Sequence, residues 1–166
     1  MTTKKIVYKR PDGGVSVTCP SPRHIAELMD SGMTEDDAIA LVQAKDVPSG
    51  ATNVEVIELS TIPASREFRN AWEKPAVGPP TVNMPKARAI HVKRISDAKV
   101  DSVIVLQKRI DEATLDDRTT DATKAANDKT AVEGLDLATF AAQIAGAANP
   151  TVLSAIWPAE LQEFKP

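Results

Sequence analysis

The first third of the chain alternates short β-prone runs with turn residues. Residues 6–10 and 15–18 are two such runs on either side of Pro11-Asp12-Gly13-Gly14. Proline presets φ for a turn and glycine tolerates positive φ, so this spacing predicts a β-hairpin. A further run rich in β-branched residues, 54–59, predicts a third strand that pairs with the hairpin.

Two helical patterns lie between the hairpin and this third strand. Ser21 followed by Pro22 predicts the start of one helix, which Gly32 ends, and Thr34 predicts the cap of the next. The apolar stripe of the second helix is expected to be Ala38, Leu41 and Val42, with Ile39 to one side. Residues 1–74 are therefore expected to form a small α+β domain in which the helices cover one sheet face.

The middle of the chain combines aromatic residues with prolines. Residues 66–72 favour a short helical turn or a distorted strand, with Phe68 and Trp72 on one face. Residues 75–83 are predicted to be a proline-rich linker, because proline removes amide donors and restricts its neighbours. Thr81-Val82 could add an edge strand, and Asn83 is expected to cap the helix that follows.

That next helix is predicted to be the longest, from about residue 84 to about residue 115. A polar turn follows, and residues 121–133 predict a return helix, so the two form an antiparallel helical hairpin. Apolar positions at spacings of three and four, broken by a lysine, form a seam on the long helix. The seam consists of Val92, Ile95, Lys99, Val103, Leu106, Ile110 and Ala113. Packing within the chain is the favoured use of this seam, and a homo-oligomer through the long helix is the alternative.

The last part of the chain is expected to complete the second domain. An amphipathic segment begins at Leu137, and a final helical turn runs from Asn149-Pro150 to Trp157-Pro158. Leu161 and Phe164 follow in a tail that could dock on its own core or on a partner. Residues 84–166 are thus predicted to be a helical hairpin with a C-terminal docking segment, and the whole chain to be α+β.

Composition narrows the function classes. The 166 residues carry a net charge of -3 with acids and bases interspersed, which gives no electrostatic reason to expect specific nucleic-acid or membrane binding. The single cysteine excludes an intrachain disulfide. The N-terminal apolar run is too short for a signal peptide, so synthesis in a reducing cytoplasm is expected.

The candidates for chemistry are few. Nucleophilic catalysis would need Cys19 or a serine near His24 or His91, and Cys19 and His24 are close enough in sequence to suggest a thiolate–imidazole pair. The favoured interpretation is a buried structural cysteine and a surface histidine. His91 has no second metal ligand one helical turn away, and Gly13-Gly14 precedes a strand, as a turn does and a phosphate loop does not. The sequence therefore predicts no catalytic residue, no metal ligand and no cofactor.

Basic and aromatic residues in the middle of the chain have two interpretations. The basic cluster comprises Arg66, Arg69, Lys74, Lys86, Arg88, Lys93 and Arg94. It is either a solvated face with local ion pairs, which is favoured, or a contact surface for a partner. Phe68 and Trp72 are typical of a core, although aromatic residues beside arginines also anchor interfaces. The candidate partner contacts are Phe68, Arg69, Trp72, Arg88, Trp157 and Phe164.

Several segments together resemble a known family. They are the Pro-Asp-Gly-Gly hairpin, Ile-Pro-x-x-Arg-x-Phe-Arg-Asn-Ala-Trp at 62–72, Val-x-Met-x-Lys-Ala-Arg-x-Ile-His at 82–91 and Trp-Pro-x-x-Leu at 157–161. The chain resembles, over nearly its whole length, a family of small uncharacterised tail-region proteins of tailed bacteriophages and prophages. It departs from that family at 95–99 and 132–134, where arginines are expected.

The resemblance implies a non-enzymatic structural or assembly protein that acts through protein–protein contacts. Its partners would be other virion proteins of the fibre, baseplate or neck. It would be made in the host cytoplasm and then located in the tail region of the virion. A capsid or neck accessory protein is the alternative, and a small enzyme or a nucleic-acid-binding regulator is less favoured.

Overall fold

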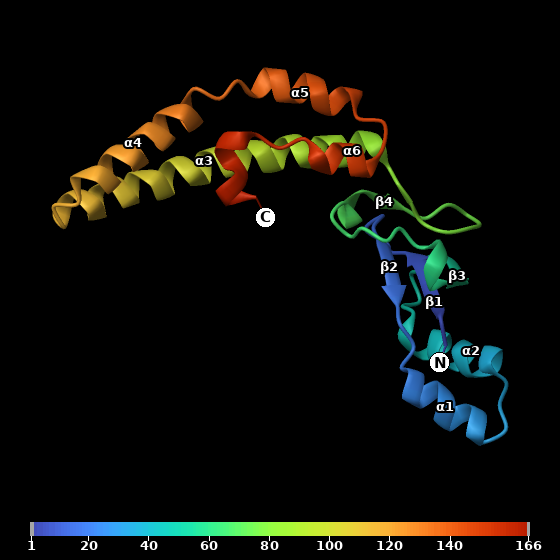
Figure 1. Cartoon of the computed structure of the whole chain (residues 1–166). Helices are drawn as coiled ribbons and strands as arrows, with labels where there is room; N and C mark the ends of the chain where they lie inside the picture. Colours follow the sequence, from blue (N-terminus) through green and yellow to red (C-terminus); the bar gives the residue numbers. More distant parts are fainter. Residues whose placement is uncertain (1, 166) are drawn as a thin grey trace. The chain divides into compact units, whose positions relative to one another are not determined.

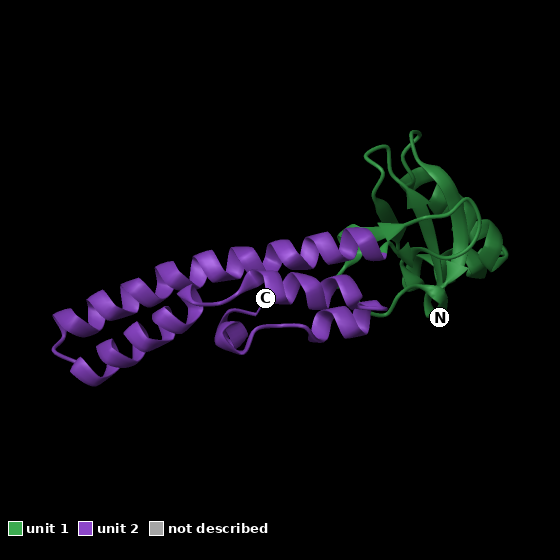
Figure 2. Ribbon diagram, turned by 90° about the horizontal axis from the view of Figure 1, so that it is seen from above, with its two compact units in different colours: residues 1–83 green, residues 84–166 purple. Residues whose placement is uncertain are grey.

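The computed structural model of the chain describes residues 2–165 and divides it into two compact units, Met1–Asn83 and Met84–Pro166 (Figures 1 and 2). Unit 1 contains a three-stranded antiparallel sheet and two α-helices, and unit 2 is helical. The predicted α+β fold is therefore confirmed.

The sheet of unit 1 is built around the predicted hairpin. Strands β1 (Lys4–Lys9), β2 (Val15–Thr18) and β3 (Thr52–Glu58) lie in the order β2-β1-β3. The turn closes through Arg10 N–H to Gly14 O at 2.8 Å, and Gly13 takes a φ of 83° there. Both neighbours pair antiparallel with β1, which makes β1 the central strand.

Helices α1 (Pro22–Asp30) and α2 (Glu35–Asp46) begin where their caps predict, because Ser21 and Thr34 accept hydrogen bonds from first-turn amides. They pack against the side of β1 that carries Ile6 and Tyr8. One detail of the predicted stripe is wrong. Ile39 is buried and Leu41 is exposed, because the face turned to the sheet is centred on Ala38, Ile39 and Val42. At about 100° per residue, position 41 lies beyond the edge of that face.

A second apolar cluster contains Val7 of the central strand, together with Val15, Ile62 and Trp72. Alternate residues of β1 therefore belong to two different clusters, so the central strand is buried on both sides. Trp72 enters this cluster from β4 (Trp72–Glu73), which pairs antiparallel with β5 (Thr81–Val82). Two short 3-10 turns, Leu59–Thr61 and Arg69–Ala71, lead the chain from β3 to β4.

The proline-rich segment is part of unit 1 and is not a linker. The side chain of Lys74 is fully buried, and its Nζ donates to Glu55 Oε2 at 2.7 Å, Gly78 O at 2.8 Å and Pro75 O at 3.2 Å. The Gly78 amide donates to the same Glu55 oxygen at 2.9 Å. Because these bonds fix the loop between β4 and β5, the boundary of the unit lies after Asn83, nine residues beyond the predicted end at 74. Asn83 Nδ2 donates to Glu73 within this unit.

Unit 2 is organised along α3 (Met84–Leu115), which has the predicted bounds. Helix α4 (Thr119–Glu133) begins two residues earlier than predicted and returns beside α3, which confirms the helical hairpin (Figure 2). Helices α5 (Leu137–Gly146) and α6 (Pro150–Ala155) and the 3-10 helix η3 (Ala159–Phe164) follow. All three pack on α3.

The buried stripe of α3 lies within the chain and only partly follows the predicted seam. Its members are Ala87, His91, Ile95, Ala98, Ser102, Leu106 and Ala113. Val92 of the predicted seam is exposed, and Lys99 donates to Glu133 O and Leu135 O, each at 3.0 Å. The seam is therefore used mainly for packing against other helices of the same unit, as the favoured interpretation has it.

The C-terminal tail docks on its own unit. His91 Nε2 lies 2.7 Å from Ile156 O, and because a carbonyl only accepts, this nitrogen is the donor. Trp157 Nε1 donates to Leu161 O at 2.8 Å, and Leu161 is fully buried. Arg88 donates to Ala147 O at 2.7 Å. Main-chain carbonyls of the C-terminal segments thus receive donors from the N-terminal half of α3.

We expect Lys74→Met to destabilise unit 1 by about 1–3 kcal/mol, because it leaves the Pro75 and Gly78 carbonyls without their shared donor. Native-state hydrogen exchange of the β1 and β3 amides in the full chain measures this locally. Lys45→Met, at an exposed lysine of α2, is the control and should change exchange by less than about 0.5 kcal/mol. Equal effects of the two variants would contradict the assigned role of Lys74.

The same network predicts an acid-sensitive contribution to stability. The hydrogen bond from Lys74, and after it the Gly78 amide, lowers the pKa of Glu55 below its ordinary value of 4.5. A carboxyl whose pKa is lower in the folded state stabilises that state above the unfolded pKa, and this contribution is lost as the pH falls through the folded pKa.

Thermal unfolding of the wild type and of Glu55→Gln between about pH 3 and pH 7 tests this linkage. The difference between their melting temperatures should be largest above pH 4.5 and should decrease as the pH falls below that value. In a Lys74→Met background the effect of Glu55→Gln on the acid limb should become smaller without vanishing, because the Gly78 amide still donates to Glu55. A gap that is independent of pH would show that Glu55 is not linked in this way.

Candidate functional site

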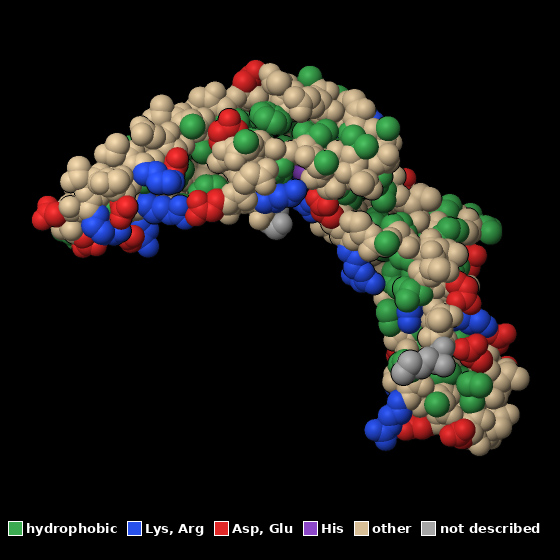
Figure 3. Space-filling view, in the orientation of Figure 1, with side chains coloured by type: hydrophobic (Ala, Val, Ile, Leu, Met, Phe, Trp, Pro, Cys, Tyr) green, Lys and Arg blue, Asp and Glu red, His purple; other side chains and the backbone are tan. Residues whose placement is uncertain are grey.

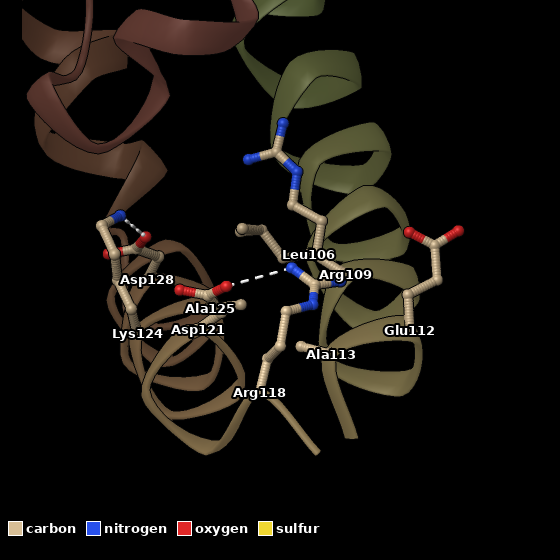
Figure 4. A pocket seen from close by; sticks show the side chains of 9 residues that line it. All are labelled: Leu106, Arg109, Glu112, Ala113, Arg118, Asp121, Lys124, Ala125 and Asp128. Atoms are coloured by element: carbon tan, nitrogen blue, oxygen red, sulfur yellow. Dashed lines mark hydrogen bonds and ion pairs between the residues drawn. The ribbon is translucent and has the colours of Figure 1, made fainter. Parts of the chain in front are cut away.

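A cavity of about 260 Å³ lies between α3 and α4, near the turn of the helical hairpin (Figure 4). Its lining is mostly charged. The residues are Leu106, Arg109, Glu112, Ala113, Arg118, Asp121, Lys124, Ala125 and Asp128. Three side chains are cationic and three are anionic, so the lining as a whole is neutral at pH 7.

Each cation of the lining is held by a carboxylate. Arg118 donates to Asp121 at 3.0 Å and to Asp116 at 3.1 Å, and Lys124 donates to Asp128 at 2.6 Å. The hydrogen bonds that Arg118 and Lys124 donate to these carboxylates raise the pKa values of both cations. Both cations therefore stay charged at neutral pH and are already neutralised locally.

Arg109 on α3 forms a two-pronged ion pair with Glu163 of η3. The hydrogen bond between them raises the pKa of Arg109 and lowers that of Glu163. The guanidinium also lies 5.9 Å from the centre of the Phe164 ring. Arg109 thus connects the C-terminal 3-10 helix to α3, because its charge is paired with Glu163 of that helix.

Three of the six predicted contact residues lie in cores. Phe68, Trp72 and Trp157 are buried in the units to which they belong. Arg69 is exposed on unit 1. Arg88 is half-buried against Ala147 O, and Phe164 is half-buried beside Arg109. Phe68, Trp72 and Trp157 are therefore core residues in this structure, which is the favoured interpretation of the aromatic pair.

The residues considered for catalysis or metal binding differ in burial and in their partners. Cys19 is exposed, so the expectation that it is buried is wrong. His24 is exposed and lies 3.8 Å from Glu27, whereas His91 is buried and its Nε2 bonds to the Ile156 carbonyl. Within residues 2–165, no three His, Cys, Asp or Glu side chains are grouped as a metal site.

The basic cluster is partly neutralised within its own units. Lys74 is buried against Glu55, and Lys93 donates to both oxygens of Asp97 at 2.8 Å. Basic and acidic side chains are interleaved over the helical hairpin in the view of Figure 3. These two lysines form local ion pairs, which is the favoured interpretation of the basic cluster.

The sequence reasoning missed a surface on α3. Eight exposed positions at spacings of three and four form a line on the side opposite the buried stripe. We call this line the outer stripe; it consists of Ala89, Lys93, Asp97, Val100, Ile104, Gln107, Asp111 and Leu115. The sequence itself indicates this surface, because Val100 and Ile104 lie one helical turn apart and outside the predicted seam.

Three members of the outer stripe are large and apolar. Val100 is 58% exposed, Ile104 is 64% exposed and Leu115 is 85% exposed. The core of unit 2 does not use these side chains, since its buried stripe lies on the other side of α3. Val100 and Ile104 therefore form an exposed apolar pair, one helical turn apart, on this side of α3.

None of the helices in the described part of the chain has the length and apolar character that crossing a bilayer requires.

A double-mutant cycle on Arg109→Gln and Glu163→Gln tests how much the ion pair between α3 and η3 contributes to the free energy of unfolding. Because both side chains are substantially exposed, we expect a coupling of about 0.2–1 kcal/mol that shrinks as salt is added. Chemical unfolding of the four proteins at low and high ionic strength measures it. A coupling several times larger and independent of salt would show that the pair is effectively buried.

Comparison of the chain with protein-family models, with curated proteins and with solved structures found no match.

Proposed function

We propose that this chain is a non-enzymatic structural or assembly protein of the tail region of a tailed bacteriophage. It acts through protein–protein contacts, with a fibre, baseplate or neck protein as partner. The assignment to a phage tail rests on the resemblance of segments 62–72, 82–91 and 157–161 to tail-region proteins. The contact role rests on the folded chain itself.

The observation that carries the contact role is the outer stripe of α3. A helix that packs on one side normally presents polar residues on the other, because exposing apolar side chains to water is unfavourable in free energy. Here Val100 and Ile104 lie on the solvent side, one turn apart, with Leu115 further along the same line. Covering these side chains with another protein would bury apolar area without disturbing the core.

The rest of unit 2 is consistent with a rigid support for this surface. Helix α3 has 32 residues and is held by α4, α5, α6 and η3 on its buried side. The outer stripe therefore lies on one continuous helix. A preformed surface of this kind loses little conformational freedom when a partner binds.

Co-purification with named tail proteins tests the proposal. The full chain, carrying an affinity tag, would be expressed together with fibre, baseplate and neck proteins of the same phage. We expect one of these to co-purify with the wild type. Val100→Asp combined with Ile104→Asp should reduce recovery by about tenfold or more, because charges replace the centre of the contact.

Val77→Asp is the matched control, since Val77 is 81% exposed but lies in unit 1. It should leave recovery of the partner unchanged. Circular dichroism would confirm that all three proteins fold. Mass spectrometry of purified particles then separates a virion component, which is present, from an assembly factor, which is absent. Failure of every tail protein to co-purify would contradict the proposal.

A further inference from the structure

The outer stripe of α3 is symmetric about the level of Ser102. Its positions form pairs at equal distances on either side of Ser102. In each pair both residues are apolar or both are polar. The pairs are Val100 with Ile104, Asp97 with Gln107, Lys93 with Asp111, and Ala89 with Leu115. All eight side chains are exposed, and at about 100° per residue they fall within an arc of about 80° on the helix.

This symmetry is what an antiparallel contact between two identical helices requires. In a two-fold interface, residue i of one copy meets residue j of the other, and j meets i. With the two-fold axis crossing the outer stripe at the level of Ser102, Val100 of each copy lies against Ile104 of the other. Ala89 lies against Leu115, which is 85% exposed in the single chain.

Charge selects the antiparallel orientation. In an antiparallel pair the ammonium of Lys93 meets the carboxylate of Asp111 from the other copy. In a parallel pair in register, lysine would meet lysine and aspartate would meet aspartate, and like charges placed opposite each other are unfavourable. The line thus has its apolar pair at the centre and opposite charges toward its two ends.

The charged members can change partners at little cost. Lys93 now bonds to Asp97, and Asp111 accepts from Gln107 Nε2 at 2.8 Å, each within one helix. The Lys93 side chain is 75% exposed, so its present ion pair is screened by water. The nearby Lys108–Glu112 pair is satisfied within its own helix and need not change.

We infer that the outer stripe of α3 binds a second copy of this chain, as a two-fold antiparallel pair of α3 helices centred at the level of Ser102. The inference rests on the proposed contact role of that same surface. Because the second copy covers Val100 and Ile104, a tail protein would bind there only in place of the second copy. It differs from an oligomer through the predicted seam, because most of that seam is covered by other helices of unit 2.

Sedimentation equilibrium of the full chain, from about 10 to 500 µM, tests the inference. We expect a reversible association from 17.8 kDa to twice that mass. Val100→Glu combined with Ile104→Glu should raise the dissociation constant by about tenfold or more. Lys45→Glu, at an exposed lysine of unit 1, changes the net charge by the same amount and should leave the dissociation constant unchanged.

A charge swap tests the register. Lys93→Glu alone and Asp111→Lys alone should each weaken the dimer, because each places like charges across the interface. The two substitutions together should restore it, since opposite charges would again face each other at these two positions. The loss of the Lys93–Asp97 pair is common to Lys93→Glu and the double variant, so it cancels in that comparison.

The outcomes separate this inference from the proposed function. A protein that stays monomeric at every concentration, or a dimer that ignores these substitutions, overturns the antiparallel pair. Such a protein could still co-purify with a tail protein through Val100 and Ile104, and the proposed function would then stand. A dimer with the predicted rescue that binds no tail protein supports the pair and contradicts the tail role.

Discussion

The structure of unit 2 depends on a mismatch in helix length. Helix α3 has 32 residues and α4 has 15, which correspond to about 48 Å and about 22 Å. A return helix of this length covers only the C-terminal half of α3, where Lys129 reaches Gln107 and Lys99 reaches the end of α4. The buried stripe continues to Ala87, so the N-terminal half needs another cover. Helices α5 and α6 supply it, with Arg88 and His91 bonding to carbonyls at their C-terminal ends, whereas η3 packs beside Arg109 and α4.

Unit 1 depends on a comparable constraint at its proline-rich loop. Prolines cannot supply the amide donors that would hold such a loop to a sheet. Lys74 replaces them with one buried ammonium that donates to two loop carbonyls and to Glu55 of β3. The loop joins two paired strands and brings Trp72 into the cluster around Val7. One side chain thus turns a segment that resembles a linker into part of a folded unit.

Once these two constraints are met, the aromatic and basic residues of the middle of the chain have structural roles. Trp72 and Phe68 fill cores, Lys74 holds a loop, and Arg88 and His91 bond to carbonyls of the C-terminal segments. The charged cavity beside α4 is neutralised by its own ion pairs. The large apolar side chains of the outer stripe remain exposed, and packing within unit 2 does not explain them. The proposals for function are based on this surface for that reason.

Local chemistry along the chain determined where the elements begin and end. Ser21 and Thr34 cap helices as predicted, Gly13 makes the hairpin turn, and α3 has its predicted bounds, since each depends on a few neighbouring residues. The tertiary structure decided which face of each element is covered. Helix periodicity allows Ile39 or Leu41 to point inward, and it allows either side of α3 to be the core. Only the position of β1 beside α2, and of α4 to η3 beside α3, selects Ile39 and leaves Val100 and Ile104 outside. The burial of Lys74 was likewise decided in three dimensions, because its partner Glu55 lies nineteen residues away in the chain.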